Sequence, residues 1–174
     1  IKKDDIRNHG SGNIGATNVN RLIGKKFGFI TLFLDFLKTF CPCLIMHKYF
    51  GTEVGVASGF LTILGHIYPI WLKFKGGKGV ASYMGFMLAT SWPLFIVLII
   101  TWLVIVKIFK YSAVAAIISI LINLITFKII LFTQFNYNIL LWIKGDPIEF
   151  QFILFISIII LIKHYTNVIN IFKK

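Results

Sequence analysis

The sequence predicts an all-α fold, a polytopic integral membrane helix bundle, and three observations support this prediction. First, the 174 residues are 57% hydrophobic and only 14% charged, whereas soluble domains are about one quarter charged. Second, the apolar residues form six long runs that lack the alternation of barrel strands. Third, the net charge of +12 comes mostly from residues that lie between those runs. In lipid only helices and closed barrels satisfy the backbone, so these runs are predicted to be helices.

Six apolar segments define the predicted helices: residues 28–50, 53–68, 79–90, 93–109, 112–133 and 148–163. A spanning helix needs about 20 residues. The first and fifth segments are long enough, whereas the second and third are short, which predicts tilt, a break or extension into interfacial loops. Pro93 and the Gly-Asp-Pro turn at residues 145–147 separate neighbouring segments. We treat residues 1–174 as a single membrane-embedded domain.

The Lys and Arg residues predict the orientation in the membrane. If the six helices cross the membrane in alternating directions, fourteen of the 18 basic residues lie on the same side of it. They fall in residues 2–26, 73–78, 107–110 and 163–174. Basic loops face the cytoplasm, so this side and both ends of the chain are predicted to be cytoplasmic. In a soluble protein the same charge would suggest nucleic acid, but here no nucleic-acid partner is expected.

Cys41 and Cys43 lie in an apolar run and are predicted to be buried small hydrophobes.

A glycine-rich polar stretch, GSGNIGATNVNR at residues 10–21, lies on the basic side. Small residues let backbone N–H groups approach an anion, and the planar guanidinium of Arg21 suits a phosphate. The alternative is a flexible loop between two helices. The Walker pattern for nucleotide phosphates is absent. The candidate phosphate-binding residues are Gly10, Ser11, Gly12, Asn13, Thr17, Asn18 and Arg21.

A second stretch, LGHIYPIWLKFKGGKGV at residues 64–80, places a lysine among glycines directly before a predicted helix. The free N–H groups of a helix N-terminus, together with glycines and a lysine, make a good phosphate site. The alternative is an ordinary basic loop with glycine turns. The candidate phosphate-binding residues here are Lys75, Gly76, Gly77, Lys78 and Gly79.

Further polar residues lie within or at the ends of the apolar runs. Asp35 and Lys38 are three residues apart in one run and are predicted to form a structural pair that faces the bundle interior. His66 stands near a helix end, where a hydrogen-bonded interfacial histidine is more common than a catalytic one. His164 and Asn167 share one helix face at the basic end, either as a substrate contact or as an ordinary polar cap.

These motifs together resemble the bacterial acyl-phosphate:glycerol-3-phosphate acyltransferases, the PlsY family, over most of the chain. GSGNIGATNVNRLIGKKFG is similar to the first motif of that family, and LDFLK at residues 34–38 to the helix that follows it. LGHIYPIWLKFKGGKGVAS resembles the second motif. KYSAVAAIISIL at residues 110–121 resembles the third, with Ala113 where a hydroxyl is expected. KHYTNV resembles the C-terminal His-x-x-Asn.

The resemblance implies a seven-helix enzyme of the bacterial cytoplasmic (inner) membrane. Such an enzyme transfers a fatty acyl group from acyl phosphate to the 1-hydroxyl of glycerol 3-phosphate, which gives lysophosphatidic acid and inorganic phosphate for phospholipid synthesis. A functional link to the enzyme that makes acyl phosphate is therefore expected. The first helix of the family has no counterpart in these residues, so about 20–30 further residues are expected upstream.

Matched position by position, the resemblance implies catalytic roles for His164, Asn167 and Ser11, and it adds Ser112 to the phosphate-binding set. Acyl phosphate is already activated, so positioning and charge stabilisation are the main requirements. No acyl-enzyme, cofactor or metal ion is expected. The base for the hydroxyl is either His164 or the phosphate of the donor.

Two other function classes stay open, a transporter of a phosphorylated solute and a structural assembly protein. A transporter usually shows repeat symmetry and midplane charges, and a structural protein does not need two glycine–cation loops. Among acyltransferases, the thioester-using class carries His-x4-Asp. The positions five residues after the four histidines instead hold Ile14, Thr52, Trp71 and Ile169. We therefore expect acyl phosphate as the donor, and neither acyl-CoA nor acyl-carrier protein.

Overall fold

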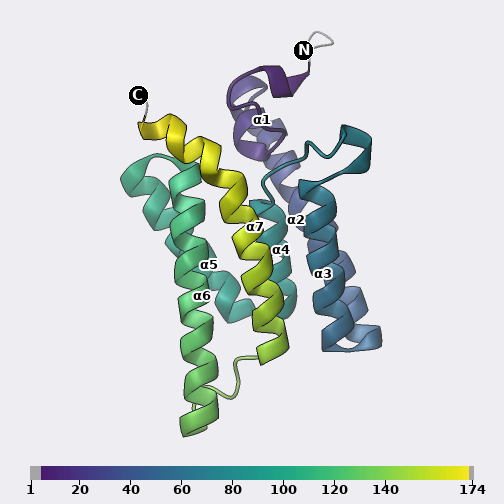
Figure 1. The fold of residues 1–174 in the computed structure, drawn as a ribbon, viewed down its shortest axis with the longest axis vertical. Coiled ribbons are helices and arrows are strands. Elements are labelled where there is room, and N and C mark those ends of the chain that lie inside the picture. Colours follow the sequence, from purple (N-terminus) through teal and green to yellow (C-terminus); the bar gives the residue numbers. More distant parts are fainter. Residues whose placement is uncertain (1–4, 173–174) are drawn as a thin grey trace.

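The computed structural model describes residues 5–172, without the side chains of residues 166–168 and 170–172. The elements in chain order are η1 (Ile6–Asn8), α1 (Ala16–Leu22), α2 (Lys25–Phe50), α3 (Thr52–Ile67), η2 (Ile70–Leu72), α4 (Val80–Thr90), α5 (Trp92–Phe109), α6 (Ser112–Tyr137) and α7 (Pro147–Phe172). Figure 1 shows these helices as one bundle. The described residues contain no strand, so the predicted all-α helix bundle is confirmed. Helices α2 to α7 correspond to the six predicted apolar segments.

Within the described residues, five segments are long and apolar enough to cross a membrane: α2, residues 52–72, α5, α6 and residues 147–165. The second predicted segment reaches this length because η2 extends α3. By contrast, α4 has only 11 residues, about half of a full span. The chain is therefore a multi-pass membrane protein in which α4 is too short to span the bilayer. The short third segment that the sequence predicted is this helix.

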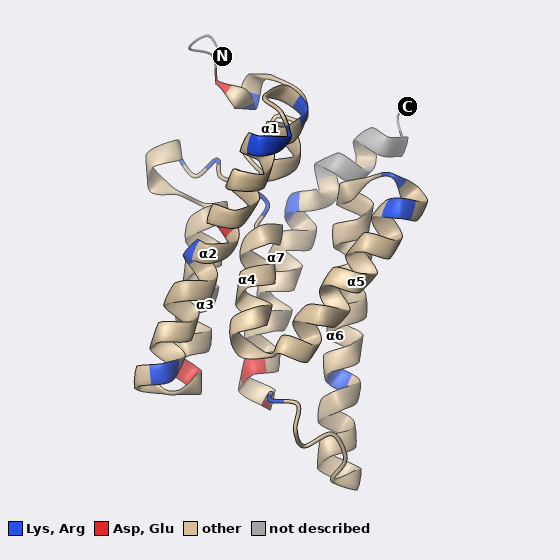
Figure 2. Ribbon diagram, turned by 180° about the vertical axis from the view of Figure 1, so that it is seen from behind, with Lys and Arg blue, Asp and Glu red and all other residues tan. Residues whose placement is uncertain are grey.

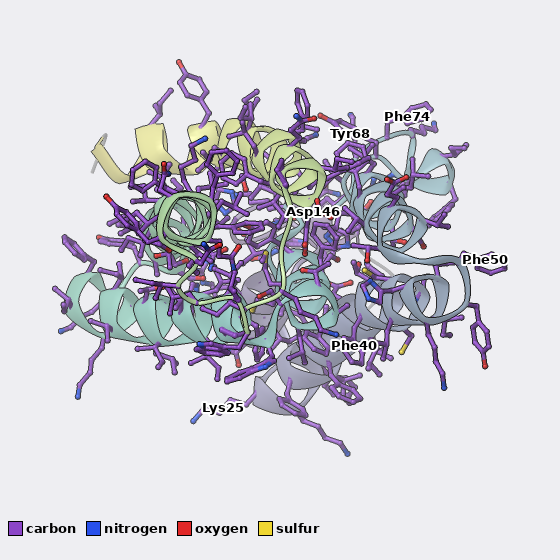
Figure 3. All side chains as sticks on the ribbon, turned by 90° about the horizontal axis from the view of Figure 1, so that it is seen from below. Lys25, Phe40, Phe50, Tyr68, Phe74 and Asp146 are labelled. Carbon is purple, nitrogen blue, oxygen red and sulfur yellow. The ribbon has the colours of Figure 1, made fainter. Side chains whose placement is uncertain are left out.

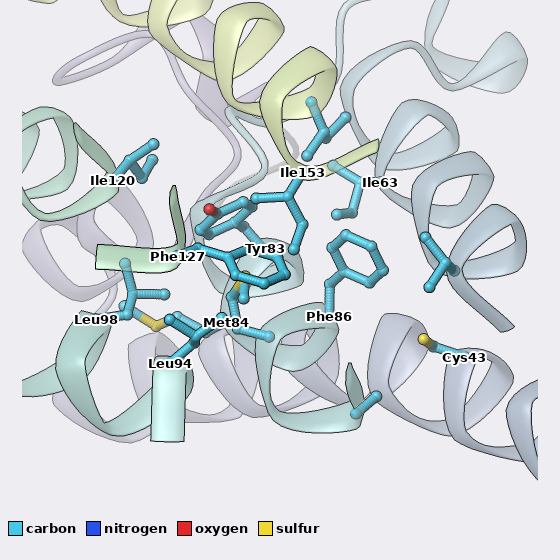
Figure 4. Close-up of a cluster of buried hydrophobic side chains, with 14 of the residues drawn as sticks. Cys43, Ile63, Tyr83, Met84, Phe86, Leu94, Leu98, Ile120, Phe127 and Ile153 are labelled. Atoms are coloured by element: carbon cyan, nitrogen blue, oxygen red, sulfur yellow. The ribbon is translucent and has the colours of Figure 1, made fainter. Parts of the chain in front are cut away.

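The short helix α4 forms the centre of the bundle, where it packs against α2, α3 and α5. Most of its side chains are buried, among them Tyr83, Phe86 and Met87, which are fully buried (Figure 4). The Tyr83 hydroxyl lies 3.3 Å from the Ser157 hydroxyl, which donates to it. This contact gives the buried hydroxyl a partner, which a polar group needs inside an apolar core. Because α4 is held from several sides, its first residue is a fixed point for the loop before it.

The outer surface of the bundle is apolar. Long hydrophobic side chains of α2 and α5 project outward from the ribbon (Figure 3), which suits a protein whose solvent is lipid. Cys43 is fully buried, as predicted, but the prediction for Cys41 is wrong because this residue is exposed. Residues two apart on a helix lie about 200° apart, so both thiols cannot face the core.

The two ends of the bundle differ in charge. Both termini, α1, the α3–α4 segment and the α5–α6 connection lie at one end, which we call the basic end (Figure 1). Figure 2 shows that most described Lys and Arg residues lie towards this end, whereas the acidic residues of the α2–α3 turn and the start of α7 lie at the other. The predicted separation of charge is therefore present along the axis of the bundle.

Candidate functional site

A cavity of about 910 Å³ lies at the basic end of the bundle. The sequence-predicted site residues that line it are Gly10, Ser11, Asn13, Thr17, Asn18, Arg21, Lys78, Gly79, Ser112 and His164. The fold therefore brings the first glycine-rich stretch, the end of the second, the start of α6 and the end of α7 to one cavity. Helices α2, α4 and α5 complete its wall.

The side-chain amide of Asn18, on α1, holds the first loop together. Its Nδ2 donates to the carbonyl oxygens of Ile6, His9 and Asn13 at 3.4, 3.1 and 2.8 Å. Its Oδ1 accepts from the Ser11 backbone N–H at 2.9 Å. Gly10 adopts a φ of +61°, and a Cβ there would lie within 3.0 Å of this Oδ1. The Asn18 amide is thus occupied by the loop, so it shapes the loop and does not provide the phosphate contact that the sequence suggested.

We expect Asn18→Ala to lower the free energy of unfolding by about 2 kcal/mol, because several partly buried backbone groups lose their partner. The measurement is thermal unfolding of the detergent-solubilised protein. Asn136→Ala is the matched control, since the Asn136 amide donates to its own helix, at Phe132, near the opposite end. Equal stability of the two variants would contradict the structural role of Asn18.

The short helix α1, which the sequence did not predict, carries two of the polar cavity residues. Thr17 and Arg21 are four residues apart on it, so they lie on the same helix face. The Thr17 hydroxyl is 3.4 Å from the Ser112 hydroxyl at the start of α6. This contact joins two regions that are 95 residues apart in the chain. Arg21 is exposed, so its guanidinium is free to meet an anion at the cavity.

The glycines of the second stretch have a different role from the one predicted. Gly76 N–H donates to the Ile67 carbonyl at 3.2 Å, and Gly77 N–H donates to the His66 carbonyl at 3.1 Å. A Cβ at Gly76 or Gly77 would lie within 3.0 Å of atoms of His66. The two glycines are therefore required by close packing on the end of α3. The predicted phosphate-binding residues that do not line the cavity are Gly12, Lys75, Gly76 and Gly77.

Lys78 and Gly79 place a cation at the start of α4. Gly79 adopts a φ of +84° and is the N-cap of α4, which favours glycine because other residues are strained there. The Lys78 Nζ is buried and has no hydrogen-bond partner among the described residues. Burial lowers the pKa of the Lys78 ammonium from 10.5 to about 8. An unpaired cation at a helix N-terminus is an arrangement that suits a phosphate.

His164 reaches the cavity from α7 and is 3% exposed. Its Nδ1 lies 2.8 Å from the Ile160 carbonyl oxygen. A carbonyl only accepts, so Nδ1 carries the proton and the neutral ring keeps a lone pair on Nε2. His164 can therefore accept a hydrogen bond from a hydroxyl in the cavity. Asn167 lies in α7, but its side chain is outside the described residues.

Asp35, Lys38 and His66 form a charged cluster beside the cavity, which Asp35 and His66 line. Lys38 Nζ lies 2.6 Å from Asp35 Oδ1, as expected for the predicted pair. It also contacts His66 Nδ1. The structure therefore places this pair, which the sequence suggested to be merely structural, at the wall of the candidate site.

The remaining wall of the cavity is apolar. It is lined by Leu32, Val80, Met84, Ile99, Trp102, Leu103 and Val106, from α2, α4 and α5. Leu32 and Leu103 are also exposed on the outer surface of the bundle, so the apolar wall continues to the lipid-facing side. The cavity thus combines a polar, cationic part with an apolar part that can hold an alkyl chain.

Comparison with known proteins identifies the family. The sequence model of the family described as "Glycerol-3-phosphate acyltransferase" matches residues 1–174. The chain belongs to the glycerol-3-phosphate acyltransferase family. A glycerol-3-phosphate acyltransferase of Bartonella henselae is 38% identical over 172 residues, which cover 96% of this chain and 75% of that protein. One of Aquifex aeolicus is 39% identical over 171 residues, which cover 97% and 82%.

The fold of this acyltransferase is also similar to solved structures. The glycerol 3-phosphate form of PlsY, an integral membrane glycerol 3-phosphate acyltransferase, superimposes with a TM-score of 0.86 at 34% identity and covers 99% of this chain and 80% of that one. The lysophosphatidic acid form gives a TM-score of 0.81, also at 34% identity, over 94% and 78%. Family membership thus favours an enzyme over the transporter that the sequence left open.

Several cavity residues of the acyltransferase were not predicted as site residues. Lys110 and Tyr111 lie in the short α5–α6 connection, where the sequence showed a basic topology signal and the start of the third motif. Trp102 lies in an apolar run that carries no motif. Asp35 was also not predicted as a site residue. The sequence did contain a signal for it, because ionisable residues within a membrane helix are usually functional.

Proposed function

We propose that this acyltransferase transfers a fatty acyl group from acyl phosphate to the 1-hydroxyl of sn-glycerol 3-phosphate. The products are 1-acyl-glycerol 3-phosphate, or lysophosphatidic acid, and inorganic phosphate. The observation that carries this proposal is the cavity itself, which joins a cationic polar part to an apolar wall that continues to the lipid-facing side. Both substrates carry phosphate, and only the donor carries a long alkyl chain, so one cavity with two such parts suits both.

The polar part supports the binding of phosphate. Arg21 and Lys78 provide two cations from different segments of the chain, and the Thr17 and Ser112 hydroxyls lie between α1 and α6. Guanidinium and ammonium groups form strong charge-assisted hydrogen bonds with phosphate oxygens. In this account Ser11 adds a hydroxyl at the exposed rim. The apolar wall, which includes Met84 and Trp102, holds the acyl chain.

The reaction forms one bond and breaks another. The oxygen of the 1-hydroxyl attacks the acyl carbonyl carbon, and an ester bond forms. The bond between that carbon and the bridging phosphate oxygen breaks, so the bonding electrons leave with phosphate. The hydroxyl proton passes to His164 Nε2, the ring nitrogen that keeps a lone pair, and then to the departing phosphate, which becomes hydrogen phosphate. Cations beside the phosphate stabilise the charge that develops during this step.

We also propose that the basic end faces the cytoplasm of a bacterial cell, in the inner membrane. Loops rich in Lys and Arg stay on the cytoplasmic side, and the described basic residues gather at this end (Figure 2). The substrate glycerol 3-phosphate is charged and water-soluble, so it reaches this end from the cytoplasm. An enzyme that makes acyl phosphate must supply the donor at the same membrane surface.

Acyl phosphate should be the donor, and acyl-CoA and acyl-carrier protein should give no product. The purified full-length enzyme is incubated with glycerol 3-phosphate and each donor at equal concentration, and lysophosphatidic acid is quantified. The physical reason is that phosphate leaves readily from a mixed anhydride, so no Asp-oriented base of the His-x4-Asp type is needed. Comparable rates with acyl-CoA would overturn the donor assignment and leave the acyltransferase activity standing.

Binding of the phosphate substrate should weaken as pH rises through about 8. The lowered pKa of Lys78 means that its ammonium is lost near this pH and not near 10.5, while the substrate phosphate is already a dianion. We expect KM for glycerol 3-phosphate to rise by up to about tenfold per pH unit above this point. Lys78→Arg should remove the inflection, because a guanidinium stays charged. A constant KM between pH 7 and 9.5 in the wild type would contradict this.

A further inference from the structure

The proton position on His66 follows from its neighbour Lys38. Lys38 Nζ contacts both Asp35 Oδ1, at 2.6 Å, and His66 Nδ1. Lys38 Nζ forms an ion pair with the Asp35 carboxylate, and an ammonium has three donors and no acceptor. His66 Nδ1 must therefore accept, and the proton of the neutral ring lies on Nε2.

A direct hydrogen bond between His66 and Asp35 would place the proton on Nδ1 and not on Nε2. In that common arrangement Nδ1–H donates to the carboxylate, and Nε2 keeps the lone pair. Here the distance between His66 Nδ1 and Asp35 Oδ1 is 3.5 Å, longer than an ordinary hydrogen bond. The Lys38 ammonium contacts both groups instead. The cluster thus turns a potential base into a hydrogen-bond donor.

His66 Nε2 faces the loop that carries Lys78. A Cβ at Gly77 would lie within 3.0 Å of the His66 ring. The nearest ring atom would be Nε2, followed by Cε1 and then Cδ2. The tip of the ring therefore packs against Gly77, in the space that a side chain at this position would otherwise fill. Among the described residues the side-chain hydrogen bond found for His66 is at Nδ1 and none is found at Nε2, while the residue lines the same cavity as Lys78.

We infer that His66 is a phosphate-binding residue of the active site and that it donates its Nε2–H to the same phosphate as Lys78. Asp35 and Lys38 are positioning residues, which act by fixing the proton on Nε2. The inference rests on the proposed function for the identity of the substrate, but the binding of phosphate itself can be tested without turnover. His164 has the opposite arrangement, with its proton on Nδ1. One histidine thus donates to phosphate and the other accepts from the hydroxyl.

The first test reads the proton position directly. The purified full chain in detergent is labelled with ¹⁵N-histidine, and the His66 signals are assigned by their loss in His66→Gln. We expect the neutral Nε2–H form in the wild type. In Lys38→Met, His66 should change to the Nδ1–H form, because Asp35 then becomes the acceptor for Nδ1. Lys48→Met, at the far end of α2, is the matched control and should leave the signals unchanged. An Nδ1–H form in the wild type would overturn the inference.

The second test measures binding of inorganic phosphate by calorimetry. His66→Leu should weaken binding about tenfold, the effect of losing one hydrogen bond to a charged group. His66→Gln should retain binding to within about threefold, because its amide nitrogen can occupy the place of Nε2. His47→Leu, at the other end of the bundle, is the control. Unchanged phosphate affinity in folded His66→Leu contradicts the inference. If His66→Leu does not fold, the inference is decided by the proton position on His66 in the wild type and by the affinity of Lys38→Met for inorganic phosphate.

The two proposals fail separately. A wild-type protein that binds phosphate through His66 but forms no lysophosphatidic acid from acyl phosphate would refute the proposed function and leave the role of His66 standing. If the wild type turns over acyl phosphate while His66→Leu binds phosphate normally, the role of His66 is refuted and the proposed function stands.

Discussion

Lys78→Met should reduce kcat/KM for glycerol 3-phosphate at least about tenfold, which corresponds to a loss of about 1.4 kcal/mol in the transition state. The Lys78 Nζ is buried at the cavity and has no partner among the residues that the structure describes, so these residues make little use of its charge. Arg21→Met, from the other side of the cavity, should have an effect of the same size. Steady-state kinetics in lipid nanodiscs measures both.

The control for these variants is Lys107→Met. Lys107 is exposed near the end of α5 and does not line the cavity, so its removal changes the charge of the basic end without touching the site. Its kcat/KM should stay near the wild-type value. Near-normal turnover in well-folded Lys78→Met and Arg21→Met would show that the two residues do not hold the substrate phosphate.

Gly76→Ala should also reduce kcat/KM by at least about tenfold, mainly through a higher KM. The added Cβ would overlap the backbone carbonyls of His66 and Ile67, and backbone atoms in a packed helix end cannot yield as a flexible side chain does. The loop would therefore shift, and Lys78 would shift with it. A displacement of about 1 Å in a positioning element is enough for losses of this order.

Gly65→Ala provides a close control for Gly76→Ala. Gly65 lies in α3, one residue before His66, and a Cβ there meets no atom within 4 Å. Alanine also favours a helix over glycine, so this variant should be as active and at least as stable as the wild type. Equal activity of the Gly65 and Gly76 variants would show that the second loop tolerates movement.

Much of the fold could be predicted because hydrophobic runs and turn residues are local signals. The six apolar segments became α2 to α7, and even the short third segment matched α4. The short helix α1 was not predicted, since seven residues with only two large apolar side chains, Val19 and Leu22, are too few to show a hydrophobic period. Cys41 was misplaced because composition alone does not give the face of a helix.

The site was predictable in its parts and not in its contacts. Glycine-rich stretches and cations indicated phosphate, and the cavity does collect Arg21, Lys78 and His164. The sequence could not show that Asn18 is used within its own loop, or that Gly77 makes room for the ring of His66. These contacts lie within irregular loops, where no periodic pattern in the sequence fixes the path of the backbone, so only the structure shows them.

The most direct test of the proposed reaction is its stoichiometry in a reconstituted membrane. The purified full-length protein receives a long-chain acyl phosphate and glycerol 3-phosphate, and lysophosphatidic acid and inorganic phosphate are measured in the same samples. We predict that the two products appear in equal amounts, that omission of glycerol 3-phosphate stops both, and that Lys78→Met slows both together. Phosphate release without lysophosphatidic acid, or release that does not depend on glycerol 3-phosphate, would contradict acyl transfer at this cavity.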